Sequence, residues 1–245
     1  MSRGMSADQD LTVKRTPHLK EVLPQALGDR VYDLIKSDII LCKLVPGEEV
    51  TEVRLAERYG FGRAPVRAAL SKLVQEGLVS VVPRRGYLVS PITIKAVQEI
   101  FDLRLVLEPS AVRAAVGRVD IQALRSLNTY PSGSDSERQN LRFLQRNREF
   151  HTEIFKACGN ERLIRILSAL YDEMDRLLHL GLFTERDAFV MKLNHEEQGL
   201  QHDAIIEALA AEDGGRAAEA TKQHIEASHG LALKAILNGR LSFSL

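Results

Sequence analysis

One stretch, residues 59–89, constrains the fold of this chain more than any other: YGFGRAPVRAALSKLVQEGLVSVVPRRGYLV. It begins with a tight glycine-containing turn and continues into an amphipathic pattern over 64–77, which predicts a helix. Pro65 lies in the first turn of that helix, where a missing backbone N–H costs little, and Gly77 ends it. Two β-rich runs follow, joined by the tripeptide 84–86 (RRG), which indicates a hairpin with a basic tip.

Two more helices are expected before this stretch. Apolar residues recur at helical spacing over 28–44, and the turn 46–47 (Pro-Gly) ends that helix. Thr51 can cap a second helix over 52–60, with Gly60 in its C-cap position. The order helix, helix, tight turn, helix, hairpin is typical of a winged helix-turn-helix.

The helix over 64–77 has a basic side and an apolar side. Arg63 and Arg67 lie four residues apart on one face, so they could bond guanine bidentately or hold a phosphate if the helix enters a major groove. Arg84 and Arg85 suit a wing that touches phosphates or the minor groove. Residues 54–85 hold seven Lys+Arg against two Asp+Glu, a local basic patch. The alternative is a basic helix that faces only solvent.

Composition and charge argue against several other classes of protein. The formal net charge is zero, which argues against a basic coat or an acidic tail. Cys42 and Cys158 form no C-x-x-C pattern, so we expect buried free thiols in a reducing cytoplasm. No apolar run approaches the roughly 18 residues of a membrane span, and no signal-peptide core is present. We therefore expect a soluble, cytoplasmic protein with no membrane partner.

The sequence pattern changes beyond Pro91, where long amphipathic helices replace all strand signals. We expect a mainly α protein in which the winged helix-turn-helix, with three helices and a β-hairpin, precedes an all-helical antiparallel bundle. The expected domains are a flexible tail (1–20), a DNA-binding domain (21–92) and a helical domain for effector binding and dimerisation (93–245). The helices of the bundle are expected near 93–117, 119–129, 137–158, 161–182, 186–212 and 216–238.

Four polar residues of the helical half have spacings that suit a metal. Asn147 and His151 are four residues apart, hence on one helical face. His202 and His224 flank the DGG turn at similar distances, so in an antiparallel hairpin both lie roughly 15 to 18 Å from it. Three imidazoles and an amide oxygen would suit a divalent metal such as zinc or nickel. Polar residues filling a wet bundle interior are the alternative.

Arg104 has apolar helix neighbours, which suggests that it faces the bundle interior. It could clamp an effector carboxylate bidentately. The alternative is an ordinary ion pair with Glu108, four residues later on the helix. Both interpretations stay open on sequence grounds.

The N-terminal stretch resembles the GntR family of bacterial transcriptional regulators. The matching pieces are Pro46-Gly47, Leu55-Ala56, GRAPVRAAL at 62–70, EGLV at 76–79 and Gly86. The family commonly reads SRTPVREAL where this chain reads GRAPVRAAL, so Gly62 and Ala64 replace a capping Ser and a DNA-contacting Thr. In the family the matching arginines contact DNA, so the resemblance implies that role for Arg63 and Arg67. The expected DNA-binding residues are Arg54, Arg63, Ala64, Arg67, Arg84, Arg85 and Gly86.

The helical half resembles the FCD effector domain of the FadR subfamily. The resemblance rests on FDLRLVLEPSAVRAAV, NREFHTEIFKACGN and QHDAIIEALAAEDGGRAAEATKQHI. Many members bind a metal through an Asp and three His, which by position implies Asn147, His151, His202 and His224, with the Asp replaced by Asn147. Such regulators often bind organic acids, which implies the effector role for Arg104.

The resulting expectation is a ligand-responsive repressor that binds a palindromic double-stranded operator as a homodimer. A small carboxylate, bound alone or on a metal, would modulate that binding. A metal-dependent bundle enzyme is disfavoured, because one Glu-x-x-His spacing is present where a di-iron site needs a pair, and no P-loop or G-x-S-x-G motif occurs. A winged helix that binds a protein partner is the remaining alternative.

Overall fold

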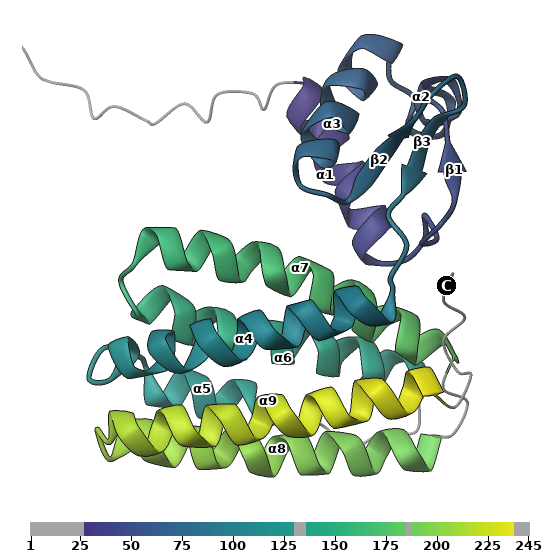
Figure 1. The fold of residues 1–245 in the computed structure, drawn as a ribbon. Helices are drawn as coiled ribbons and strands as arrows, with labels where there is room; N and C mark the ends of the chain where they lie inside the picture. Colours follow the sequence, from purple (N-terminus) through teal and green to yellow (C-terminus); the bar gives the residue numbers. More distant parts are fainter. Residues whose placement is uncertain (1–26, 130–135, 185–187, 238–245) are drawn as a thin grey trace, which may run out of the picture.

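The computed structural model describes residues 27–129, 136–184 and 188–237. The expected tail 1–20 lies outside these residues. The described chain is mainly helical, with a small N-terminal unit placed against a larger bundle (Figure 1). Its elements are α1 (Leu27–Ile40), β1 (Glu49–Val50), α2 (Glu52–Tyr59), α3 (Arg63–Gln75), β2 (Val79–Val82), β3 (Gly86–Val89), α4 (Ile94–Ala115), α5 (Ile121–Leu127), α6 (Ser136–Ala157), α7 (Glu161–Thr184), α8 (Ala188–Ala210) and α9 (Gly214–Leu237).

The N-terminal unit is a winged helix-turn-helix, as predicted. Local signals fix its second helix: the Thr51 hydroxyl accepts a hydrogen bond from Arg54 N at 3.2 Å, and Gly60 ends the helix in the left-handed conformation. Gly62 stands at the N-cap of α3 without a side-chain hydrogen bond. A single core of buried residues from α1, α2, α3 and the strands, including Ile35, Leu55 and Leu70, holds the unit together.

The hairpin belongs to a three-stranded antiparallel sheet of order β1-β3-β2. Sequence reasoning missed β1, which pairs Glu49 with Leu88 and Val50 with Tyr87. Gly86 is required at the start of β3, since its φ is +115° and a Cβ there would lie 2.6 Å from the Val50 carbonyl oxygen.

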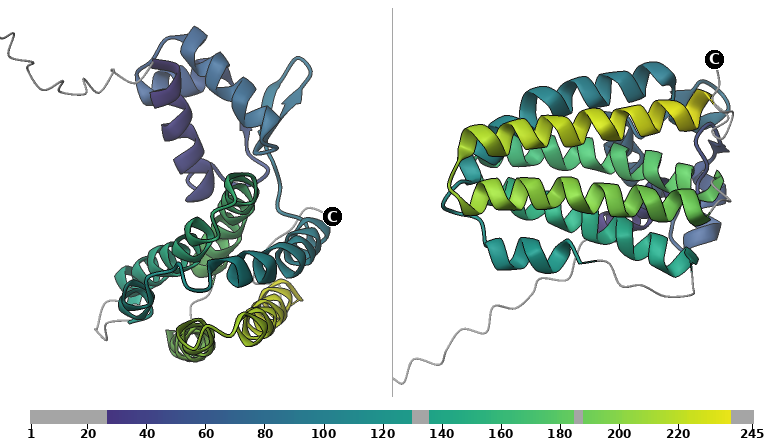
Figure 2. Two further views of the ribbon diagram at one scale, coloured as in Figure 1. Left: turned by 90° about the vertical axis from the view of Figure 1, so that its left-hand side faces the viewer. Right: turned by 90° about the horizontal axis from the view of Figure 1, so that it is seen from below.

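The second unit is an antiparallel helical bundle, as predicted, and each helix end lies within two residues of the expected position. In the two views of Figure 2, α8 and α9 run side by side and α4 lies next to α9. The core gathers apolar side chains from α4 to α9, among them Phe101, Phe150 and Leu167. Within the described ranges, none of the helices combines the length and apolar character that crossing a bilayer requires.

Helix α7 carries the contacts between the two units. Arg176, which is 4% exposed, donates from Nη2 to the carbonyl of Ser90 at 2.6 Å, in the segment between β3 and α4. The Cys42 thiol, in the loop after α1, lies 3.5 Å from the Arg176 carbonyl oxygen. Lys36 of α1 pairs with Asp172 at 2.8 Å. The N-terminal unit is thus fastened to one helix of the bundle at α1 and at the linker.

Candidate DNA-binding surface and metal centre

Helix α3 has the two sides that its sequence predicts. Val66, Leu70 and Leu73 are fully buried against the N-terminal core. Arg63 and Arg67 are exposed on the opposite side. The hydrophobic side fixes the helix on the domain, and the basic side stays accessible to a duplex.

Arg67 is held by a carboxylate that the sequence analysis did not anticipate. Its Nε and Nη2 donate to the two carboxylate oxygens of Glu52 at 2.8 and 2.7 Å, while its side chain remains 65% exposed. These bonds from Arg67 lower the pKa of Glu52, so that the carboxylate stays charged. The Tyr87 hydroxyl lies 3.4 Å from the same carboxylate. Strand β3 and helix α2 therefore both help to orient this guanidinium.

The other basic residues divide into two groups. Arg54 pairs with Glu48 and Arg85 with Glu49, each at 2.8 Å. Among the described residues, Arg63 and Arg84 have no carboxylate within ion-pair distance. Arg84 occupies the turn of the hairpin with φ +65°.

The charge balance of the surface is therefore less basic than the sequence window suggested. Glu48, Glu49 and Glu52 stand just before the 54–85 window and fold back onto its arginines. Ala64 and Gly86 add no charge, with Ala64 exposed and Gly86 half-buried. Phosphate oxygens must compete with these glutamates, and such exposed pairs are worth only about 0–1 kcal/mol each.

Three histidines from three helices meet inside the bundle. His151 of α6, His202 of α8 and His224 of α9 are buried, and their candidate ligand nitrogens all lie within 4.8 Å of one another. The predicted approach of His202 and His224 across the α8–α9 hairpin is present, with ring centroids 4.7 Å apart. His151 lies 5.2 Å from each of the other two rings.

Side chains outside the triad fix two of these rings. His202 Nδ1 lies 3.2 Å from Asn128 Oδ1, and His224 Nδ1 lies 3.0 Å from Gln201 Oε1. Because an amide oxygen only accepts, each ring donates from Nδ1 and carries its lone pair on Nε2. The Asn128 amide is itself oriented, since its Nδ2 donates to Asp203 Oδ1 at 2.7 Å. This is the outer-shell support that metal-binding histidines usually have.

Burial keeps the three imidazoles neutral. It lowers the pKa of His202 to about 3 and moves the pKa values of His151 and His224 well below the usual range. Neighbouring imidazoles and Arg104 act in the same direction for these rings. A neutral imidazole is the form that binds a metal.

The donor set fits a divalent cation. Asn147 is 7% exposed, and its Oδ1 has no hydrogen-bond partner; the same holds for His151 Nε2. A buried acceptor left without a donor costs about 1–3 kcal/mol. Both atoms belong to α6, four residues apart on its interior face, as the sequence predicts. A cation at this position would satisfy both of them.

Arg104 is buried beside the triad. Its Nε donates to Glu108 Oε1 at 2.5 Å, and its Nη2 donates to the Tyr171 hydroxyl at 3.1 Å. Tyr171 in turn donates to Glu108 Oε2 at 3.0 Å, and that oxygen lies 3.8 Å from His151 Nδ1. The intrahelical ion pair considered from the sequence is present, and it lies inside the bundle. Arg104 Nη1 faces the sulfur of Met174 at 3.8 Å.

Comparison with known proteins identifies the family. Residues 27–89 match the bacterial regulatory proteins of the gntR family, and residues 99–227 match the FCD domain. The HTH-type transcriptional repressor GlaR of Escherichia coli K12 is 31% identical over 201 residues, which is 79% of this chain and 90% of that protein. The chain belongs to the GntR family of bacterial regulators.

Further relatives agree with this placement. The repressor RspR of the same strain is 25% identical over 205 residues, covering 82% of this chain and 87% of its own. Among solved structures, E. coli McbR/YncC has the same fold, with a TM-score of 0.72 at 21% identity over 86% of this chain and 99% of its own. The chain is a DNA-binding transcriptional regulator with an FCD domain, in a family of regulators and not of enzymes.

Proposed function

We propose that this regulator is a repressor that binds a palindromic operator as a homodimer and responds to a small carboxylate sensed in its helical half. The carrying observation is the pairing of two features in one chain: an exposed arginine face on α3 and a buried imidazole triad in the bundle. The first suits recognition of a duplex and the second suits recognition of a cation or its ligand.

The DNA-reading part of the proposal rests on α3 and the hairpin. Arg63 and Arg67 would reach base edges or phosphates from the start of the recognition helix, while Arg84 and Arg85 would approach the backbone from the wing. Arg54 at the start of α2 would contact phosphate. Two such modules in a dimer would read two half-sites.

The sensing part rests on the bundle interior. His151, His202, His224 and the Asn147 amide oxygen would hold a zinc or nickel ion, which supplies a positive charge for an organic acid. Arg104 would contribute Nη1, since its Nε and Nη2 stay bonded to Glu108 and Tyr171. The carboxylate would bind one arrangement of the bundle more tightly and so shift the operator affinity.

The test uses operator duplexes selected from a random pool by the full-length protein. Replacing Arg67 by Ala should weaken binding by about 1–3 kcal/mol. It should also lower the slope of log Kd against log salt concentration by about one, which corresponds to the loss of one phosphate contact. Arg165→Ala, an exposed arginine on α7, is the matched control and should change neither quantity. Full operator affinity in Arg67→Ala would contradict the assignment and favour a protein-binding winged helix.

The sensing half is tested on the same complex. Zinc or nickel, followed by a panel of small carboxylates, should change the operator Kd, because a ligand that prefers one state shifts the equilibrium toward it. If neither the metals nor any carboxylate alters operator binding, the histidine and Arg104 assignments both fail.

A further inference from the structure

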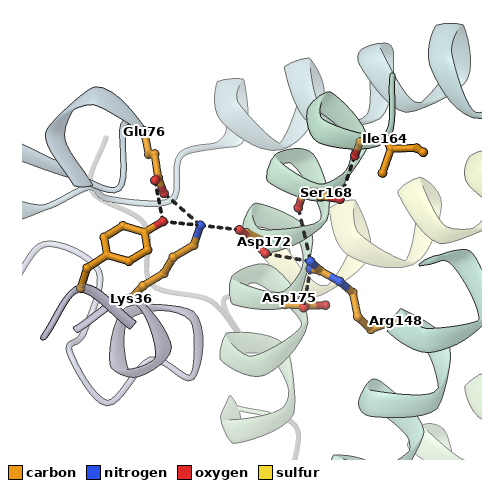
Figure 3. Close-up of polar contacts among 8 residues, drawn as sticks. Lys36, Glu76, Arg148, Ile164, Ser168, Asp172 and Asp175 are labelled. Carbon is orange, nitrogen blue, oxygen red and sulfur yellow. Dashed lines mark hydrogen bonds and ion pairs between the residues drawn. The ribbon is translucent and has the colours of Figure 1, made fainter. Parts of the chain in front are cut away.

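A network of charged side chains crosses the junction between the two units (Figure 3). Its first member is Lys36 of α1, whose ammonium group contacts three oxygens: Asp172 Oδ2 at 2.8 Å, Glu76 Oε2 at 2.9 Å and the Tyr32 hydroxyl at 3.0 Å. Glu76 is the C-cap residue of α3. Lys36 therefore joins the end of the recognition helix to α7 of the bundle.

The network continues from α7 to α6. Arg148 donates to Asp172 Oδ1 at 2.9 Å and to Asp175 Oδ2 at 2.8 Å, so the two oxygens of Asp172 are divided between Lys36 and Arg148 (Figure 3). Arg148 follows Asn147 directly and precedes His151 by three residues. The guanidinium that holds Asp172 is thus carried by the helix that presents two of the candidate metal-binding atoms.

Burial makes this network more than a set of solvated surface pairs. The side chains of Lys36, Asp172 and Arg148 are 22%, 17% and 26% exposed, so solvent and salt screen them less than exposed pairs. Burial raises the pKa of Asp175 to about 6 although Arg148 opposes the shift, which indicates poor solvation. The guanidinium of Arg148 also lies 5.9 Å from the ring centroid of Tyr171, the residue that bonds Arg104.

We propose that Asp172 is the coupling residue of this regulator: it transmits the state of the metal centre from Arg148 on α6 to Lys36 on α1, and from there to the recognition helix α3. The inference rests on the proposed function. A cation held by Asn147 and His151 would fix the position of α6 and therefore that of Arg148. Asp172 bonds Lys36 through Oδ2 and Arg148 through Oδ1. The strength of the Lys36–Asp172 ion pair therefore depends on the position of Arg148.

Among the described contacts at the junction, the bond between Arg176 and the linker cannot report on α6 in this way. The bond from Arg176 to the Ser90 carbonyl joins α7 to the linker without a side chain from α6. It fastens the N-terminal unit whatever the state of the metal centre. Arg176 therefore only attaches the unit, whereas Asp172 both attaches it through Lys36 and carries the proposed communication.

The experiment measures the coupling between zinc and operator in the full-length protein. Operator Kd is determined with zinc added and after chelation, using a duplex selected in vitro. The unaltered protein should show a ratio of about 5- to 150-fold between the two conditions. Asp172→Asn should make the two operator affinities equal while zinc affinity, measured by competition with a chelating dye, stays unchanged. Glu207→Gln removes one partner of the exposed Arg125–Glu207 pair and should keep the full ratio.

A second variant and a second measurement separate coupling from folding. Lys36→Met removes the other end of the bridge and should bring the zinc-dependent ratio of operator Kd values to one, as Asp172→Asn does. The double variant should show no further change in this ratio. Hydrogen exchange should show zinc-dependent protection of α1 and α3 amides in the unaltered protein and not in either variant. A zinc-dependent ratio that survives in folded Asp172→Asn or Lys36→Met overturns the relay. Absence of zinc or operator binding in the unaltered protein instead overturns the proposed function, and the relay with it.

Discussion

At the scale of single residues, Asn147 sets the strength of the proposed metal centre. Its amide oxygen stands where many FCD proteins carry an aspartate, so the four donors together have no negative charge. Replacing Asn147 by Asp should therefore tighten zinc binding by about tenfold or more, because a charged oxygen attracts a dication more strongly. Competition with a chelating dye measures the change.

A matched variant distinguishes ligation from a general effect of added charge. Asn160→Asp introduces the same change at the start of α7, where Asn160 Oδ1 accepts from the backbone N–H groups of Arg162 and Leu163. It should leave zinc affinity unaltered. An Asn147→Asp protein with the zinc affinity of the unaltered chain would remove this residue from the ligand set.

The residues that support the candidate sites were harder to predict than the central ones. Spacing on two helices and around one turn suffices to bring His202 and His224 together. Asn128, which orients His202, comes from α5's C-cap, 74 positions earlier, and no local pattern marks it. Glu52 was missed for the same reason, since its bond to Arg67 depends on how α2 packs against α3.

At the scale of secondary structure, short-range signals predicted most elements. Thr51 acts through a side-chain hydrogen bond to Arg54 N, and Gly60 and Gly77 act through positive φ angles. Each signal works within a few residues, so the helix ends near them could be predicted. Strand β1 could not, because two residues carry no periodicity and its pairing with β3 joins positions almost forty residues apart.

The junction of β1 with β3 yields a prediction for Gly86. Gly86→Ala should destabilise the protein by about 1–3 kcal/mol, because alanine is strained at φ +115° and its Cβ would collide with the Val50 carbonyl. Denaturant unfolding measures the loss. Gly28→Ala in α1 is the control: a Cβ there meets nothing within 4 Å, so stability should stay the same or rise. Equal stability in the two variants would contradict this account of β1.

At the scale of the whole molecule, a half-buried histidine links stability to pH. His195 of α8 stacks on Phe143 of α6 at 3.8 Å, and burial lowers its pKa to about 4. Since the unfolded chain protonates this imidazole near pH 6.5, the unfolded state binds more protons between pH 6.5 and 4, and stability falls as the pH drops through that window.

The sign of this effect can be checked by removing the titration while keeping the ring. Between pH 7.5 and pH 5, the free energy of unfolding of His195→Phe should fall less than that of the unaltered protein. The difference should be about 1 kcal/mol after allowance for solvent screening of this partly exposed group. Thermal melts at the two pH values measure it. An identical loss in both proteins would show that His195 does not contribute.

The position of β3 between β1 and β2 restricts how this molecule can change its DNA affinity. Because β3 is bonded to β1 as well as to β2, the hairpin cannot swing away from β1, and so from α2 directly after it, without breaking those hydrogen bonds. The proposed effector would then leave the conformation of the winged helix-turn-helix unchanged and rotate it as a rigid body about the segment around Ser90. In the proposed dimer, operator affinity would fall because the two winged helix-turn-helix units, each unchanged in conformation, no longer face the same side of the double helix.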